Sequence, residues 1–396
     1  MRKVLILFLL LLLTNTIGLF SQNKLTGVNL SLTSKICTQP FDQDTPSIEE
    51  QITYLNIGID SKVDHLYGLA SNLFALRSNC IKGVSVAGFG HLNHLCGEYD
   101  GVCIGGIMNM SPSGVKGLQI AGVLNSADNI AGIQISGLLG FTDELRGMQI
   151  APFNICGDCK GAQIGIANCW LGEKATLFQL GLINFNRFTK IGKRDNSVDN
   201  VFGVQVSGLI GITDALRGVQ IAPFNFCGDC KGGQIGIVNY CSSEEKSTIF
   251  QLGLINLNRS TKIQAMIFGG NSSLMNVGIR FRGKLFYNMV GMGTYSFHLN
   301  NKFSWNLSYR SGLWLPINKY LDISGDIGYQ HLMTGKNRNE SLPGSLYALQ
   351  ARLNLECKIR SKLSLFLSGG YEVIRHYGRN KTHSHQPIIE GGIILF

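Results

Sequence analysis

The chain has 396 residues, a net charge of +10 and 49 glycines, and only 15% of its residues are charged. No apolar run reaches the 18 residues that indicate a transmembrane helix. The lysines and arginines are scattered rather than gathered in a dense stripe, which argues against nucleic-acid binding. Low charge, frequent glycine and many short apolar stretches predict an all-β protein, and they also suit one whose outer face meets lipid.

Residues 1–21 have the pattern of a secretory signal peptide. Arg2 and Lys3 precede an unbroken apolar run, Val4–Leu13, which is too short to anchor the chain in a bilayer. We therefore expect export, with cleavage near Ser21. No cysteine lies at that junction, so we expect no lipid anchor there. Residues 22–53 are predicted to form an N-terminal linker segment.

Residues 54–261 form a repeat region. The blocks Gly132–Asn168 and Gly203–Asn239 align without a gap at an offset of 71 residues. A finer unit inside each block begins Gly-x-Gln-Ile and reaches an Asn a few positions later. Self-similarity at a fixed period is the signature of a repeat architecture. The glycines that open the units form two runs with a spacing of 14 or 15 residues: Gly117, Gly132, Gly147 and Gly161, then Gly203, Gly218 and Gly232.

Each unit alternates with a period of two. Ile133 and Ile135 share one face while Gln134 and Ser136 share the other, which predicts a strand. The segments between these strands are rich in Asp, Asn and Gly, as turns are. About ten strand residues followed by a short turn predict an antiparallel meander, and this strand length fits the wall of a transmembrane barrel.

Residues 262–396 contain more aromatic residues and eight candidate strands. In Phe303–Leu315, Trp305 and Leu307 share one face while Asn306 and Ser308 share the other. Apolar-out, polar-in alternation is typical of outer-membrane barrels, as is the observed alternation of short turns with longer polar loops. The final stretch, EGGIILF, resembles the C-terminal strand of bacterial outer-membrane proteins. By that resemblance the barrel-assembly machinery would recognise it.

The repeat units also resemble a known family. GLQIAGVLN, GAQIGIAN and GVQIAPFN are similar to the repeats of the leptospira-type surface-repeat proteins, which also occur in Bacteroidota. The similarity covers residues 54–258. It implies a protein of the cell-envelope surface, and it carries over no catalytic residues.

Two membrane architectures fit these patterns. A soluble secreted β-sandwich would also explain the alternation, but it explains the repeats and the terminal strand less well. The favoured fold class is a single antiparallel outer-membrane β-barrel of about twenty repeated strands. The alternative is a β-repeat domain followed by a small C-terminal barrel of eight strands, a number that can close on a side-chain-filled interior. The long segment 187–202 counts against the single barrel, because it would lie on the side where turns should be short.

The doubled motif Cys-Gly-Asp-Cys suggests a metal or redox site. On a sequential meander the two copies would lie roughly 19 Å apart, too far to share one ion, whereas a fold that stacks the blocks could bring them together. No βαβ context supports thioredoxin-like chemistry. The alternatives are thiols that flank a turn, or hairpin disulfides in the pairs Cys156/Cys159, Cys227/Cys230 and Cys96/Cys103.

These patterns predict a non-enzymatic outer-membrane or cell-surface protein with a structural or interaction role and no cofactor or metal. The expected partners are outer-membrane lipid and the barrel-assembly machinery; the surface ligand is not identified, and nucleic acid is not expected. An outer-membrane enzyme would need a Ser/His pair on neighbouring strands. The main alternative is a porin- or transporter-like channel whose lumen is lined by Gln119, Gln134, Gln149, Gln163, Gln205, Gln220 and Gln234.

Overall fold

Every described element of the chain is a β-strand. No helix among the described residues is long and apolar enough to cross a bilayer. The chain divides into two compact units, residues 1–214 and residues 215–396. The expected signal peptide lies outside the described part of the chain. The computed structural model describes residues 27–39, 51–93, 99–172, 175–186, 202–242, 249–295, 304–333, 345–377 and 382–396.

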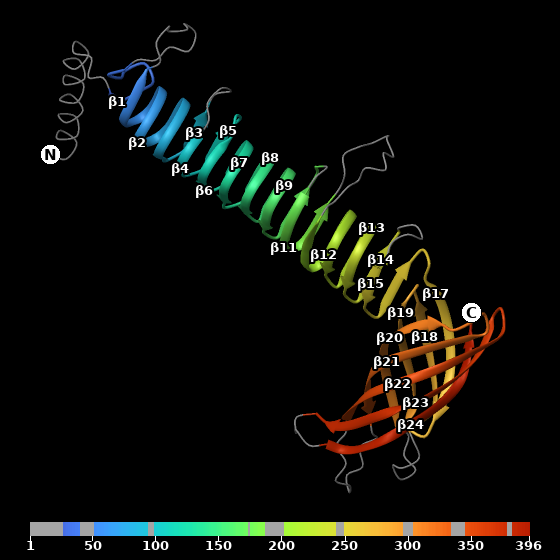
Figure 1. Cartoon of the computed structure of the whole chain (residues 1–396). Helices are drawn as coiled ribbons and strands as arrows, with labels where there is room; N and C mark the ends of the chain where they lie inside the picture. Colours follow the sequence, from blue (N-terminus) through green and yellow to red (C-terminus); the bar gives the residue numbers. More distant parts are fainter. Residues whose placement is uncertain are drawn as a thin grey trace. The chain divides into compact units, whose positions relative to one another are not determined.

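The strands of unit 1 pair in parallel (Figure 1). Gly132 is paired with Gly147, and Gly147 with Gly161. Each repeat therefore lies on the one before it, as one coil of a β-solenoid. The strands are β1 (Gly27–Ser31), β2 (Ile52–Ala87), β3 (Gly90–Asn93), β4 (Tyr99–Gly105), β5 (Met108–Ser111), β6 (Val115–Ala121), β7 (Leu124–Ser136), β8 (Leu139–Ile150), β9 (Phe153–Ile164), β10 (Ala167–Trp170) and β11 (Ala175–Asn186), and β12 (Phe202–Ile221) continues into unit 2.

The single antiparallel barrel favoured by the sequence is therefore wrong, and the alternative of a repeat region with a separate small barrel is correct. Apolar alternation has the same period in parallel and antiparallel strands, so it could not distinguish a parallel solenoid from an antiparallel barrel. β1 is a further difference. It pairs in parallel with β2, in the stretch where the sequence suggested only a linker.

Unit 2 begins with the remaining coils and continues into a closed barrel. In the coils, β13 pairs in parallel with β14 and β15, and β14 pairs with β16. Eight antiparallel strands follow, and the first is hydrogen-bonded to the last. The coil strands are β13 (Phe224–Ile235), β14 (Val238–Cys241), β15 (Ile249–Leu252) and β16 (Ile255–Asn258); the barrel strands are β17 (Lys262–Gly270), β18 (Ser273–Arg282), β19 (Phe286–Tyr295), β20 (Trp305–Pro316), β21 (Leu321–Met333), β22 (Ser345–Arg360), β23 (Leu363–His376) and β24 (Thr382–Leu395).

Two ladders of buried amides run through the coils. Gln149 donates from Nε2 to Oε1 of Gln134 at 2.8 Å, and Gln163 donates to Gln149 at 2.9 Å. Asn154 donates from Nδ2 to Oδ1 of Asn168 at 2.8 Å. These rungs link residues 14 or 15 apart, which is one coil. Stacked amide ladders of this kind satisfy buried polar groups in cross-β structures too.

Breaking one rung of the glutamine ladder should destabilise the coils around it. Gln149→Leu leaves Oε1 of Gln134 without this donor and Nε2 of Gln163 without this acceptor. Each buried group left unsatisfied costs about 1–3 kcal/mol. Amide hydrogen exchange of β8 and β9 should therefore accelerate. Arg146→Leu, which adds the same side chain at an exposed position of β8, should leave that exchange unchanged.

The last coil packs against the barrel, within unit 2. Asn288 of β19 donates from Nδ2 to the backbone carbonyl of Gln251 at 2.9 Å. The rings of Phe250 and Phe286 meet edge to face at 4.9 Å. Asn258 donates to Oε1 of Gln251 at 3.2 Å, so the glutamine ladder ends on a bonded acceptor. These contacts cover the exposed end that a repeat stack would otherwise leave.

Candidate functional site

The barrel has an apolar exterior and a polar interior. On β20, Trp305 and Leu307 point outward while Asn306 and Ser308 are buried, as the alternation predicts. Ile327 remains 71% exposed on the outer wall. This arrangement reverses that of a soluble protein, in which large apolar side chains are inside and charges outside.

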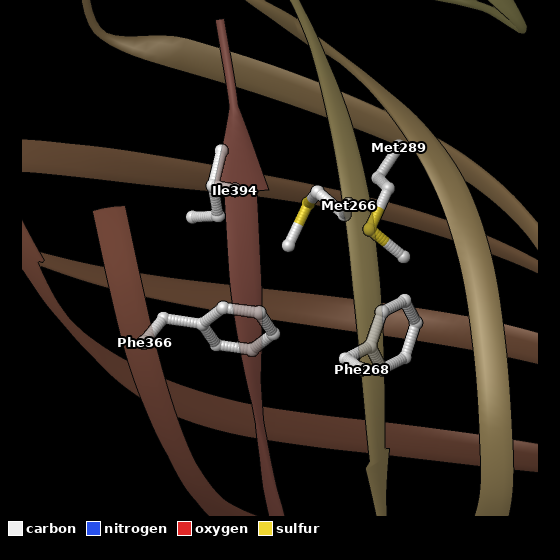
Figure 2. Packing of buried hydrophobic residues seen from close by; sticks show 5 residues of the cluster. All are labelled: Met266, Phe268, Met289, Phe366 and Ile394. Carbon is white, nitrogen blue, oxygen red and sulfur yellow. The ribbon is translucent and has the colours of Figure 1, made fainter. Parts of the chain in front are cut away.

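Two small apolar clusters lie inside the barrel, and Figure 2 shows the one beside its first and last strands. Met266 and Phe268 of β17 point to the same space as Met289 of β19, Phe366 of β23 and Ile394 of β24. The rings of Phe268 and Phe366 are in edge-to-face contact at 6.1 Å. This cluster ties the first strand to the last two, next to the β17–β24 pairing that closes the barrel.

The interior also contains two networks of buried ion pairs. In the first, Arg352 binds Asp326 at 2.9 Å and also pairs with Glu390, which Arg310 contacts at 3.2 Å. The Tyr287 hydroxyl donates to Asp326 at 2.6 Å. The charges are thus compensated and extensively hydrogen-bonded, the condition under which buried ions are tolerated.

The second network lies nearer the short turns. Arg280 binds Glu356 at 2.9 Å, and Arg282 contacts Glu356 at 3.2 Å and also pairs with Asp322. Lys358 contacts Asp322 at 2.7 Å. Together the two networks bridge strands on opposite sides of an eight-stranded wall, which is narrow enough for side chains to fill.

The glutamines expected to line a lumen are placed elsewhere. Gln119, Gln134, Gln149 and Gln163 are buried inside the solenoid and bonded to one another. Gln205 donates to Gln179 at 3.1 Å. In unit 2, Gln234 donates to Gln220 at 2.9 Å. Their amides are committed to the ladder and do not face an open channel.

The cysteines of the doubled motif lie in buried columns of the coils. Alternate residues of β9 point inward up to Cys156, and the next inward residue is Cys159, three positions later. Both cysteines are fully buried. Gly157 and Asp158 therefore form a corner of a continuous coil and not a hairpin, because β9 pairs in parallel with β8. Cys156 is in register with Trp170 and Cys159 with Leu145. The hydrogen bond with Cys159, and then burial, raise the pKa of the Cys156 thiol.

The second copy of the motif differs from the first. Cys227 and Cys230 form a disulfide with a Cα–Cα distance of 6.1 Å, whereas Cys156 and Cys159 are free thiols. Cys241 is buried in register with Cys227. Among the described residues no group of three or more His, Cys, Asp or Glu side chains is arranged to hold a metal.

The third expected cysteine pair cannot be followed in full, because Cys96 lies outside the described residues. Its expected partner Cys103 is buried, and its thiol donates to Oδ1 of Asn109 at 3.4 Å. Burial raises the pKa of Cys103 to about 12, so this thiol is protonated at neutral pH.

His91 occupies a rung of the asparagine ladder, where its imidazole is buried. Its Nδ1 is 2.8 Å from Oδ1 of Asn109, and its buried Nε2 has no partner among the described groups. Burial lowers the pKa of His91 from 6.5 to about 4. The stability that neutral His91 contributes is present above pH 6.5 and is lost as the pH falls toward 4.

At pH 4.5 the wild type should therefore lose about 2–3 kcal/mol more stability, relative to pH 7.5, than His91→Asn does. Asparagine is the matched replacement because Asn109 fills the paired position of the next coil. Urea unfolding at both pH values measures the difference. Equal pH dependence of the two proteins would show that the pKa of His91 is the same in the folded and the unfolded chain.

Comparison with known proteins adds little. No protein-family model matches the chain, and no curated protein is similar to it. One similar solved structure is the crystal structure of Neisserial surface protein A (NspA), which is 10% identical with a TM-score of 0.24. The similar region covers 34% of this chain and 93% of NspA. No family is thereby assigned, and the fold stands on the strand pairing described above: a β-solenoid repeat region and a closed eight-stranded barrel.

Proposed function

We propose that the chain is a non-enzymatic outer-membrane protein, in which the barrel is the membrane anchor and the repeats have a structural or interaction role. The barrel's inverted polarity carries this proposal. Outer-wall residues such as Leu353, which is 68% exposed, suit acyl chains, whereas Arg310 and Glu390 are buried inside. The barrel strands have 9–16 residues, which is enough to cross a hydrocarbon core at a tilt.

The order of the strands supports a periplasmic position for the repeats. Because the number of barrel strands is even, Lys262 at the start of β17 and Phe396 lie at the same end. The three connections at that end, 283–285, 317–320 and 361–362, have four residues or fewer, whereas those at the other end include the longer segments 296–304 and 334–344. In bacterial barrels short turns are periplasmic and long loops extracellular. The repeats precede Lys262, so we assign them to the periplasm, in place of the surface position expected from their resemblance to surface proteins.

The outer face of the coils supports an interaction role. Ile107, Val123, Leu138, Ile166 and Leu182 repeat at equivalent positions and are all exposed. Backbone hydrogen bonds join neighbours in this column, such as Leu138 to Val123 and Leu182 to Ile166. Contiguous exposed apolar surface usually marks a contact site. We assign this column to contact with a partner.

Cell fractionation tests the membrane assignment. We expect the full chain in the outer-membrane fraction, and we expect its migration in a detergent gel to change on boiling, because a closed barrel resists unfolding by cold detergent. Recovery in the soluble periplasmic fraction would contradict the proposal. The C-terminal strand β24 should direct insertion by the barrel-assembly machinery, so depletion of that machinery should reduce the heat-modifiable form.

The channel alternative gains no support from the described residues. The glutamines are bonded in the ladder, and ion pairs such as Arg310–Glu390 cross the barrel interior. We expect liposomes containing the protein to show no solute-dependent swelling. Swelling comparable to that of a porin control would favour the channel instead.

A further inference from the structure

A basic pocket lies at the end of the barrel that carries the short turns. It has a volume of about 820 Å³, which is within the range of small-molecule sites. None of the described residues that line it is Asp or Glu. Its cationic lining residues are Lys262, Arg282, Lys284, Lys319, Lys358 and Arg360.

Only part of this positive charge is balanced. Arg282 and Lys358 pair with Asp322, which lies behind the pocket in the barrel interior. Lys262, Lys284 and Arg360 form no ion pair with any described residue. Cations of one sign around a concavity focus the electrostatic field and raise the local concentration of anions.

The pocket is also preorganised, because its own contacts hold Arg282 and Trp314 in place, and it is partly apolar. The Arg282 guanidinium lies 3.7 Å from the centre of the Trp314 ring, and Trp314 donates from Nε1 to the carbonyl of Gly283 at 3.0 Å. Glu356 holds Arg282 from the interior side at 3.2 Å. Tyr320 adds a second aromatic ring to the lining. The guanidinium of Arg282 is already bonded to Asp322 and Glu356, so it fixes one wall of the pocket. The surrounding lysines and Arg360 supply the cationic donors that suit a phosphate group.

We propose that this pocket binds a phosphate-bearing anion. Its chemistry fits the headgroup of an anionic phospholipid, with the phosphate on the cations and the glycerol and first acyl carbons against the aromatic rings. A soluble phosphate ester offers the same anionic group. The identification of the anion as a lipid rests on the proposed function. Only a barrel with its short turns in the periplasm places the pocket beside the headgroups of the inner leaflet of the outer membrane.

Calorimetric titration of the full chain in maltoside micelles tests the pocket. The probes are short-chain phosphatidylglycerol and glycerol 3-phosphate. We expect phosphatidylglycerol to bind, and we expect Lys284→Gln/Arg360→Gln to weaken binding by about tenfold or more, since hydrogen bonds to charged groups contribute about 1.5–3 kcal/mol each. Lys160→Gln/Lys231→Gln removes the same charge from exposed positions of the coils and should bind as the wild type does.

Each outcome decides the proposal. Binding of phosphatidylglycerol alone supports the lipid headgroup, and equal binding of glycerol 3-phosphate supports a soluble source. No binding of either probe, or equal binding by the pocket variant, overturns the site, provided that the variant keeps its heat-modifiable migration. The titration does not depend on where the protein lies in the cell, so its failure is separate from a failure of the fractionation test.

Discussion

Replacing Arg352 with methionine should lower the free energy of unfolding of the barrel by about 3–5 kcal/mol. Arg352 is buried and bridges Asp326 and Glu390. Its loss leaves Asp326 with no cationic contact in its network, although Tyr287 and Asn354 still donate to it. Urea unfolding of the refolded protein in micelles, followed by heat-modifiable migration, measures the loss.

Two controls separate the lost ion pair from general disturbance of the strand. Leu353→Met changes the next residue of β22, which faces outward, and should leave stability nearly unchanged. Arg352→Met/Asp326→Asn removes the uncompensated carboxylate together with the arginine, so it should be more stable than Arg352→Met alone. If Arg352→Met proved as stable as the wild type, the ion pairs would contribute little to closing the barrel.

Gly232→Ala should destabilise the coils of unit 2 by about 2–5 kcal/mol, because two costs add. Gly232 has a φ of 151°, a conformation that residues with a Cβ rarely adopt. A Cβ at this position would lie 2.0 Å from the carbonyl oxygen of Gly218 in the preceding coil. The coils would have to separate, which stretches the parallel hydrogen bonds. Thermal unfolding followed by circular dichroism measures the effect.

The adjacent glycine is the matched control. A Cβ at Gly233 would meet its nearest atoms at 3.9 Å, an ordinary contact. The equivalent position of the first block, one 71-residue offset earlier, is Ala162. Gly233→Ala should therefore be neutral or stabilising by up to about 1 kcal/mol. Similar losses in the two variants would show that glycine is needed for chain flexibility and not for the close approach of the coils.

The sequence could predict the barrel better than the repeats. Alternation on β20 places Trp305 and Leu307 outward and Asn306 inward, and it requires no knowledge of the neighbouring strand. Alternation does not give the direction of strand pairing, since parallel and antiparallel strands both have a period of two. The signal that was missed is the recurrence of the same residue at the same position of successive repeats, which indicates parallel, in-register pairing. Gln134, Gln149 and Gln163 recur at one coil's spacing because identical amides bond when they stack.

The candidate site depended on contacts that the sequence does not show. The Cys-Gly-Asp-Cys motif suggested chemistry, yet Cys156 and Cys159 fill buried columns whose other members include Leu145 and Trp170. The basic pocket draws Lys262, Lys284 and Arg360 from segments up to 98 residues apart, 262 to 360. Only closure of the barrel brings them together.

The central claim is that the barrel spans the outer membrane with the repeats on its periplasmic side. A protease recognition sequence can be inserted between β14 and β15, and in a second variant between β21 and β22, whose connection lies at the end opposite Lys262. Protease added to intact cells should cleave only the β21–β22 insertion, and after permeabilisation of the outer membrane it should cleave both. Cleavage of the β14–β15 insertion in intact cells would place the repeats outside and contradict the account.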